Sequence, residues 1–221
     1  LETVDVDAGM AARFGAALGQ LDAALACFDY AGENPVLLWD LQRLGELRPL
    51  LRHVDDDALR AAVATAIDDY EIRVAPLQAD LPRQVIHADA NPENVLTAGD
   101  RIGFIDFSDI VTAPRVFDVA IAASYLRSGG SDPLALVRPF VAAWQSVTPL
   151  GEIETGVLFD LVRARLATSI TLLYWRLADR PAGDAYRQKS LQTEGTASHF
   201  LNLLNELGRK KFTNEIISVG V

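Results

Sequence analysis

An apolar run that ends in His87 is followed, within about twenty residues, by four polar side chains: Asp89, Asn91, Asn94 and Asp106. A core strand has no need of several carboxylate and amide groups at its end. Phosphoryl transfer does need them, because one carboxylate orients the attacking hydroxyl and accepts its proton, while Asp and Asn oxygens bind the Mg²⁺ that bridges the phosphates. This segment therefore predicts a site that holds metal and phosphate.

Short β-type runs must position these side chains. QVIH (84–87) is a short apolar run, and NVLTAGDRIGFIDF (94–107) has two β-type runs around the turn TAGD, which predicts a hairpin. Asp89 and Asn94 then lie on the loop between the two features, and Asp106 lies on the adjacent hairpin. A catalytic carboxylate, an amide and a second carboxylate would thus be supplied by neighbouring segments.

The rest of the chain follows a helical period. Apolar residues three and four apart predict a long helix that starts near residue 8, with Asp5 or Asp7 as its cap. A second helix should follow the acidic run at 55–57, and one or two short helices should lie in 36–51. Further helices are expected at roughly 115–127, 132–147, 150–178 and 185–207. The predicted fold class is therefore mainly α with a small β insert.

Composition and charge exclude several classes of protein. The chain has 221 residues, half of them apolar, which suffices for the core of one domain, and its net charge of −10 argues against a nucleic-acid surface. The most apolar long segment (157–175) carries Asp160, Arg163 and Arg165, so it predicts a buried helix and not a membrane span. A single cysteine, Cys27, allows no internal disulfide and suits a reducing, cytoplasmic location.

The two polar loops carry a family resemblance. HADANPENVL and IDFSD resemble the catalytic and metal loops of the aminoglycoside phosphotransferase and choline kinase superfamily, whose pattern is H-G-D-x-x-x-x-N followed by I-D-F/W-x-D. The resemblance implies a protein-kinase-like fold with Asp89 as the catalytic carboxylate. It implies that Asn94 and Asp106 bind Mg²⁺ and, through it, ATP or GTP. His87 would brace the loop, and Asn91 would lie near the transferred phosphate.

Two residues depart from the family pattern, and a third extends it. Ala88 replaces the usual Gly, which raises the question whether that position requires a positive φ. Ser108 replaces a frequent Gly after IDF, which narrows the freedom of the loop. FDVAIA, with Asp118, resembles a family stretch in which the Asp supports the catalytic loop from the following helix. Asp118 is therefore expected to be a buried structural carboxylate.

The resemblance extends to both sides of the loops but covers part of an enzyme. LLWDLQRLGELRPLL and RARLATSITLLYWR look like bacterial relatives of hydroxylysine kinase, which are often fused to a class III aminotransferase domain. Neither a glycine-rich strand-turn-strand nor a V-A-x-K-like strand precedes residue 84. We therefore expect residues 1–208 to be a C-terminal catalytic lobe without its N-terminal lobe, followed by a tail or linker at 209–221. The chain, which begins at Leu1, should be a piece of a longer protein and inactive or nearly so alone.

The predicted reaction of the parent enzyme is transfer of the γ-phosphate of ATP or GTP to a hydroxyl of a small amine-bearing metabolite. A 5-hydroxylysine-like amino alcohol is the first candidate, with homoserine, choline, ethanolamine and an aminoglycoside as rivals. Two other classes stay open: a non-catalytic kinase-like module that binds a ligand or regulates a fused enzyme, and a metal-dependent hydrolase that uses the same carboxylates.

Simpler structural roles compete for several of these residues. Asp and Asn are common in turns, although the joint spacing of Asp89, Asn94 and Asp106 favours a site. Asp109 could approach the amine of a substrate or cap the next segment. Four residues on helical apolar faces favour a core or snorkelling role over a pocket role: Trp39, Tyr125, Arg165 and Trp175.

Overall fold

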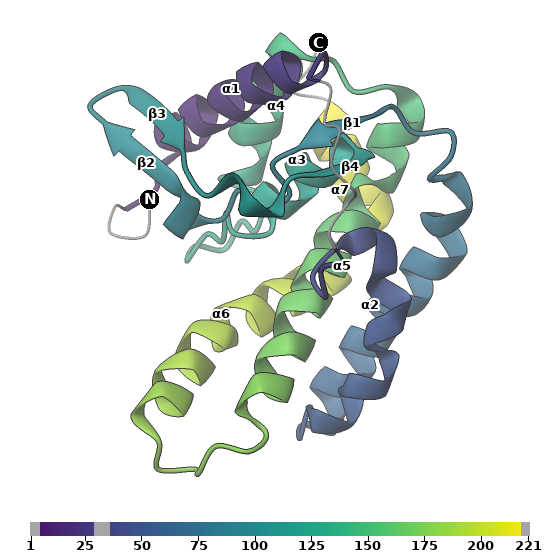
Figure 1. Ribbon diagram of the computed structural model, residues 1–221, viewed down its shortest axis with the longest axis vertical. Coiled ribbons are helices and arrows are strands. Elements are labelled where there is room, and N and C mark those ends of the chain that lie inside the picture. Colours follow the sequence, from purple (N-terminus) through teal and green to yellow (C-terminus); the bar gives the residue numbers. More distant parts are fainter. Residues whose placement is uncertain (1–4, 29–35, 218–221) are drawn as a thin grey trace.

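The computed structural model describes residues 5–28 and 36–217, and it is mainly α with a small β part, as predicted (Figure 1). The α-helices are α1 (Ala8–Leu25), α2 (Asp57–Arg73), α3 (Val116–Ala123), α4 (Val137–Val147), α5 (Glu152–Leu177), α6 (Ala185–Leu207) and α7 (Arg209–Ile217). Shorter 3-10 helices are η1 (Leu41–His53), η2 (Ala75–Leu77), η3 (Pro92–Asn94) and η4 (Phe107–Asp109).

Acidic caps set the starts of the helices where the sequence indicated them. The Asp7 carboxylate accepts the backbone N–H of Met10 at 2.7 Å at the start of α1, so Asp7 and not Asp5 is the cap. Asp56 accepts the N–H of Leu59 at 2.8 Å at the start of α2. Each cap satisfies one of the N–H groups that the first turn of a helix leaves without a partner.

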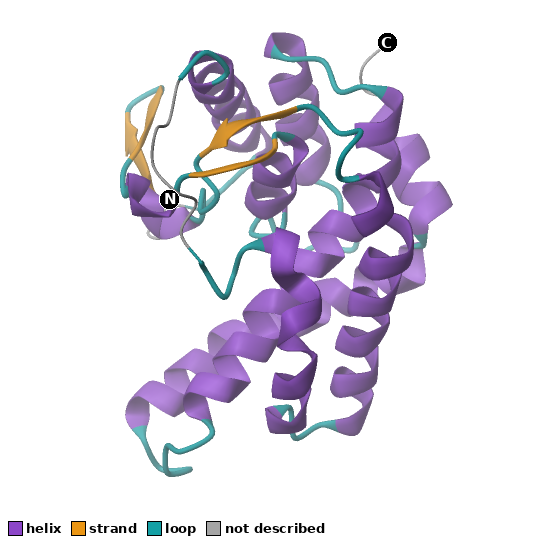
Figure 2. Cartoon of the chain, turned by 45° about the vertical axis from the view of Figure 1, so that its right-hand side comes forward, coloured by secondary structure: helices purple, strands orange, loops and turns teal. Residues whose placement is uncertain are grey.

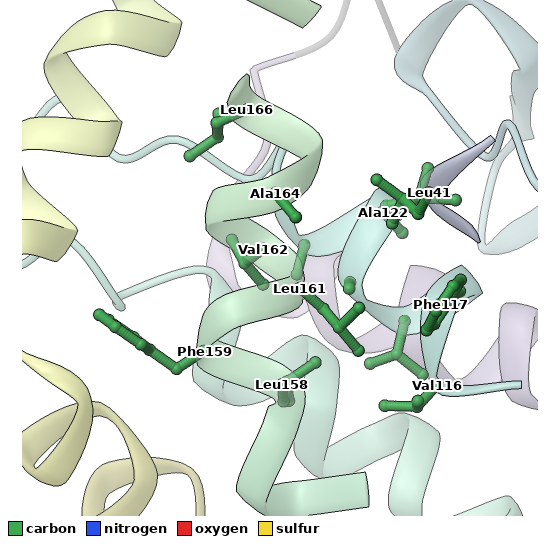
Figure 3. Close-up of a cluster of buried hydrophobic side chains, with 14 of the residues drawn as sticks. Leu41, Val116, Phe117, Ala122, Leu158, Phe159, Leu161, Val162, Ala164 and Leu166 are labelled. Atoms are coloured by element: carbon green, nitrogen blue, oxygen red, sulfur yellow. The ribbon is translucent and has the colours of Figure 1, made fainter. Parts of the chain in front are cut away.

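α5 is the central helix of the body (Figure 1). It packs against α2, α3, α6, α7 and η1, and every residue from Val157 to Thr168 is buried. Figure 3 shows Leu161 pointing toward Val116 and Phe117 of α3, while Phe159 points to the opposite side of α5. No helix in the described ranges combines the length and the apolar character that a bilayer crossing requires.

α1 and α4 lie unusually close together. A Cβ built on Gly15 of α1 would lie 2.0 Å from the carbonyl oxygen of Phe140 on α4. The absence of a side chain at Gly15 therefore permits this approach, and the ring of Phe14 beside it contacts that of Phe140 in a tilted arrangement, with ring centroids 5.1 Å apart. This helix pair forms one side of the body, next to the β part (Figure 1).

The β part consists of two antiparallel pairs, drawn in orange in Figure 2. β1 (Arg83–Ile86) pairs with β4 (Val111–Pro114), and β2 (Val95–Ala98) pairs with β3 (Arg101–Phe104). The β2–β3 hairpin is the predicted one, and Gly99 in its turn has a φ of +60° that glycine adopts without strain. The loop 87–94 leaves β1, and the loop 105–110 leaves β3 and leads into β4.

Two features differ from the sequence predictions, and a third agrees with them in a different helix type. β4 was not expected, because its residues Val111–Pro114 carry little strand signal until β1 lies beside them. The one or two short helices expected in 36–51 are present as 3-10 turns over Leu41–His53, with a kink at Arg43. The tail expected from residue 209 is, over Arg209–Ile217, helix α7, whose Phe212 and Ile216 are buried against the body. The remaining tail residues, 218–221, lie outside the described ranges.

Candidate active site

A buried carboxylate fixes the backbone at the start of the catalytic loop. Asp118 of α3 is fully buried, and its two carboxylate oxygens accept the N–H groups of His87 and Ala88, each at 2.7 Å. Two backbone donors on one carboxylate define both its position and the position of the loop. The structure thus confirms the predicted supporting role of Asp118.

The backbone conformation of Ala88 shows whether this position, where the family pattern has glycine, requires a positive φ. Its φ is +64°, in the left-handed region where a Cβ is disfavoured. The Asp118 carboxylate accepts the N–H of this same residue, so the surrounding structure enforces the strained conformation. The backbone position therefore does have the conformation for which glycine is the ordinary choice.

The His87 ring joins the two polar loops from inside. Its Nδ1 accepts the backbone N–H of Asp89 at 3.3 Å, so the ring proton lies on Nε2, which donates to the carbonyl oxygen of Ile105 at 3.0 Å. The residue is completely buried, and its ring lies 4.9 Å from that of Phe107. His87 therefore has the geometry of a brace between Asp89 and the loop that carries Asp106, and does not face a substrate.

The carboxylate of Asp89 is held by three side chains. Its Oδ2 accepts from Asn91 Nδ2 at 2.8 Å and from Asn94 Nδ2 at 3.0 Å. Its Oδ1 accepts from Arg165 Nη2 at 2.7 Å. The Asp89 side chain nevertheless keeps 19% of its surface exposed, so it is both oriented and reachable.

Asn91 and Asn94 organise the loop as well as the carboxylate. The Asn91 side-chain oxygen caps η3 by accepting the N–H of Glu93 at 2.8 Å, while its amide nitrogen donates to Asp89. Asn94 Nδ2 also donates to the carbonyl oxygen of Asp89 at 2.9 Å, which leaves its Oδ1 outside the hydrogen bonds of the described residues. The expected phosphate contact of Asn91 stays a prediction, because these bonds give its amide a local role.

Asp106 follows Ile105, whose backbone is hydrogen-bonded to the loop of Asn94. The N–H of Ile105 donates to the carbonyl oxygen of Asn94 at 3.1 Å, which joins the two loops. Asp106 is exposed with a φ of +62°, and hydrogen bonds from the Ser108 hydroxyl, at 2.6 Å, and from its backbone N–H lower the pKa of the Asp106 carboxyl group. Asp106 is therefore a carboxylate at neutral pH.

The donor set formed by Asn94 and Asp106 fits Mg²⁺. An amide oxygen and a carboxylate are hard oxygen ligands, and Mg²⁺ commonly takes one or two protein ligands together with phosphate oxygens and water. Clusters of three or more His, Cys, Asp or Glu side chains that could hold a metal are absent from the described residues. The two residues would therefore need a bound phosphate and water to complete the coordination.

A cavity of about 640 Å³ opens beside Asp89. Two further carboxylates, Glu93 and Asp109, line it with Asp89, and the aromatic rings of Trp39 and Tyr125 form part of its wall. Trp39 Nε1 donates to Asp109 Oδ2 at 2.9 Å, so Asp109 is fixed at this wall. Arg127 and Arg165 line the cavity as well, so it presents charges of both signs.

Sequence reasoning did not identify the partner of Arg165. A core or snorkelling role was favoured for Trp39, Tyr125, Arg165 and Trp175; Arg165 is indeed buried, and the first three also line the cavity. Trp175 is not among the residues that line it and is partly exposed. The one signal in the sequence is an arginine within a long apolar stretch, and it does not reveal that Asp89 is its partner.

Comparison with known proteins gives one family and several curated relatives. The model of the phosphotransferase enzyme family (APH) matches residues 2–151. The hydroxylysine kinase of Danio rerio is 28% identical over 178 residues, which cover 78% of this chain and 49% of that protein. The homoserine kinase of Brucella melitensis biotype 2 is 34% identical over 171 residues, 72% of this chain and 49% of that protein. The chain thus spans about half the length of these relatives.

Solved structures of small-molecule kinases have the same fold. The microcompartment-associated aminopropanol kinase superposes with a TM-score of 0.67 at 17% identity, over 99% of this chain and 66% of that chain. The choline/ethanolamine kinase family protein from Mesorhizobium loti gives 0.62 at 14% identity, over 93% and 66%. At these identities the likeness concerns the fold, and it confirms the expected protein-kinase-like architecture.

Proposed function

Because this chain belongs to the phosphotransferase enzyme family, we propose that the protein containing it transfers the γ-phosphate of ATP or GTP to a hydroxyl of a small amine-bearing metabolite. The observation that carries the proposal is the Asp89 carboxylate, which is oriented by three side-chain donors, lines a cavity of about 640 Å³ and lies on a loop joined to that of Asp106.

Each polar residue has a distinct part in this proposal. Asp89 orients the acceptor hydroxyl and accepts its proton. Asn94 and Asp106 hold Mg²⁺, which supplies neutralisation of the phosphate charges when it is bound. His87 keeps the two loops in register from the interior, and Asn91 orients Asp89. Little further chemistry is needed, since phosphoryl transfer depends mainly on positioning and charge stabilisation.

The charges of the cavity support an acceptor with an amine. Glu93 and Asp109 offer carboxylates near Asp89, and the Trp39 ring offers a face that attracts cations. The cavity lining also contains cationic side chains, among them Arg176 of α5 and Lys189 of α6. Charges of both signs in one cavity suit a zwitterionic amino acid better than choline or ethanolamine, so hydroxylysine-like and homoserine-like acceptors come first.

Several parts of the proposal concern the whole protein. An N-terminal lobe with a glycine-rich loop would complete the nucleotide pocket, and without it the chain would be inactive or nearly so. A fused class III aminotransferase domain and a cytoplasmic location stay predictions from the sequence.

The test is phosphoryl transfer by the complete protein, with Mg-ATP and Mg-GTP offered against hydroxylysine, homoserine, choline, ethanolamine and kanamycin. We expect turnover on one acceptor and a loss of about 10²- to 10⁴-fold in kcat in Asp89→Asn. Asp80→Asn, an exposed carboxylate outside the cavity, is the matched control and should retain activity.

The other outcomes of the same assay separate the alternatives. Phosphate release that needs no acceptor would indicate a metal-dependent hydrolase. Absence of both turnover and nucleotide binding would indicate a non-catalytic module and would contradict the kinase proposal.

A further inference from the structure

We propose that Arg165 of α5 is a positioning residue for Asp89, and that the acceptor hydroxyl binds Oδ1 of Asp89, the oxygen that Arg165 holds. This inference rests on the proposed phosphotransferase function. It adds a residue from the second half of the chain, outside the segment 2–151 that the family model matches.

The hydrogen bonds of Asp89 indicate which of its oxygens is available. A carboxylate oxygen has about two lone-pair directions for hydrogen bonds. Oδ2 already accepts two donors, from Asn91 at 2.8 Å and from Asn94 at 3.0 Å. Oδ1 accepts one donor among the described residues, Arg165 Nη2 at 2.7 Å. An acceptor hydroxyl that donates to Asp89 must therefore do so at Oδ1.

The guanidinium of Arg165 is fixed where it meets Asp89. Its side chain is 5% exposed. Nη2 also donates to the Tyr125 hydroxyl at 3.2 Å, and Nη1 lies 3.4 Å from the carbonyl oxygen of Trp39. The charge lies 5.8 Å from the centre of the Tyr125 ring. Three separate segments thus hold one side chain, which in turn fixes the orientation of the Asp89 carboxylate.

Stability alone does not account for an arginine at this position. Burial removes the hydration of the guanidinium, and a buried ion pair is often no more stable than an apolar replacement of similar volume. The Nε atom of Arg165 is buried and has no hydrogen-bond partner among the residues that the structure describes, which adds a further cost. A residue that is unfavourable in the core but contacts the proposed catalytic carboxylate is better explained by positioning.

In this arrangement each bond that forms in the chemical step is matched by a bond that breaks. The acceptor oxygen forms a bond to the γ-phosphorus of the nucleoside triphosphate, and the bond from that phosphorus to the bridging oxygen of the nucleoside diphosphate breaks. The hydroxyl proton passes to Oδ1 of Asp89. Arg165 cannot take the proton, since a guanidinium stays protonated, so it orients the acceptor of the proton without competing for it.

The experiment compares Arg165 variants of the complete protein with a matched arginine on the same helix. Arg163 is 4% exposed and forms an ion pair with Asp69, whose side chain is 24% exposed, and it does not line the cavity. We expect Arg165→Met to lower kcat by about 10²-fold with little change in the KM for nucleotide, because a misplaced reacting group loses about this factor. Arg163→Met should lower the melting temperature and retain kcat. Arg165→Lys, which can still donate to Oδ1, should regain part of the lost rate.

A double-mutant cycle with Asp89→Asn separates positioning from a general structural role. If Arg165 acts through Asp89, Arg165→Met should cause no further loss of kcat in the Asp89→Asn background. An equal loss in both backgrounds, or an unchanged kcat in folded Arg165→Met, overturns the inference. Where Arg165→Met does not fold, Arg165→Lys takes its place in the same cycle, and the same two results support or overturn the inference.

Failure of this inference is distinguishable from failure of the proposed function. Full turnover in Asp89→Asn would overturn both, because Asp89 would not be the catalytic carboxylate. Loss of turnover in Asp89→Asn together with full activity in Arg165→Met would overturn the inference about Arg165 alone.

Discussion

Asp22 on α1 and Asp118 on α3 are both buried, and this burial together with the charge of Asp118 raises the pKa of Asp22. Asp118 uses both oxygens to hold the N–H groups of His87 and Ala88. Asp22 is 1% exposed and also accepts the Trp144 indole N–H at 2.7 Å. Two neighbouring carboxyl groups can be buried together when one keeps its proton, and the environment indicates that Asp22 is the protonated member.

The first prediction concerns the pH dependence of stability. Burial, followed by the charge of Asp118, raises the pKa of Asp22 well above its ordinary value of 3.8. In the unfolded chain Asp22 ionises near pH 4, whereas the folded chain retains the proton. The protonated Asp22 therefore makes its full contribution to stability below about pH 4. That contribution is lost as the pH rises through the raised pKa. Asp22→Asn, which removes the ionisable carboxyl group and keeps a side chain of similar size, should lack this loss.

Urea unfolding at pH 4, 5, 6 and 7 measures the effect. The stability of Asp22→Asn relative to the original chain should therefore increase as the pH rises, which means that its free energy of unfolding becomes larger by comparison. Arg115, which lies near Asp22, and the Trp144 indole keep their charge state throughout this range. Parallel curves for the two proteins would contradict a protonated Asp22, and Asp80→Asn controls for the loss of an exposed carboxylate.

The strained backbone at Ala88 gives a second prediction. Ala88→Gly relieves a left-handed conformation that costs about 1 kcal/mol or more, but it adds a similar entropy to the unfolded chain. We expect a net change within about 1 kcal/mol and full activity. Ala88→Val places a β-branched residue at positive φ and should destabilise the fold by more than about 2 kcal/mol. Denaturant unfolding of both variants tests this, and equal losses would contradict it.

Two glycines on different helices provide a third prediction with an internal control. A methyl group at Gly15 would meet the Phe140 carbonyl at 2.0 Å, so Gly15→Ala must push α1 and α4 apart and should cost about 3 kcal/mol. Gly156 of α5 has no atom within 4 Å of a built Cβ, so Gly156→Ala should stabilise the helix by about 0.5–1 kcal/mol. Thermal unfolding should shift in opposite directions, and a shift in the same direction would rule out the close α1–α4 contact.

A fourth prediction distinguishes the two roles considered for Asp109. If this carboxylate binds the amine of the acceptor, Asp109→Asn should raise the KM for that acceptor about 10-fold, which corresponds to about 1.4 kcal/mol. The asparagine can still accept the Trp39 indole N–H, so stability should change little. A capping role would instead lower the melting temperature and leave the KM unchanged. Steady-state kinetics of the complete protein, with the KM for nucleotide as the internal control, decides between them.

Much of the local structure could be predicted because its causes lie close together in the sequence. The helical period and the acidic caps locate α1 and α2, and the turn around Gly99 locates the β2–β3 hairpin. The spacing of Asp89, Asn94 and Asp106 indicated a shared loop region; Asn94 donates to Asp89, and Ile105, next to Asp106, donates to the Asn94 carbonyl oxygen. These features follow from hydrogen bonds and side-chain periodicity within a few residues, which the sequence displays directly.

Other features depend on residues that are far apart in the chain. Arg165 reaches Asp89 across 76 positions, and Asp22 reaches Trp144 across 122. β4 exists because β1 lies beside it, and α7 is recognisable by the burial of Phe212 against the body. No local period encodes which helix faces meet. The sequence by itself therefore determined the polar loops and most helices, whereas only the packing of α1, α3 and α5 around the loops decided what supports Asp89 and which groups line its cavity.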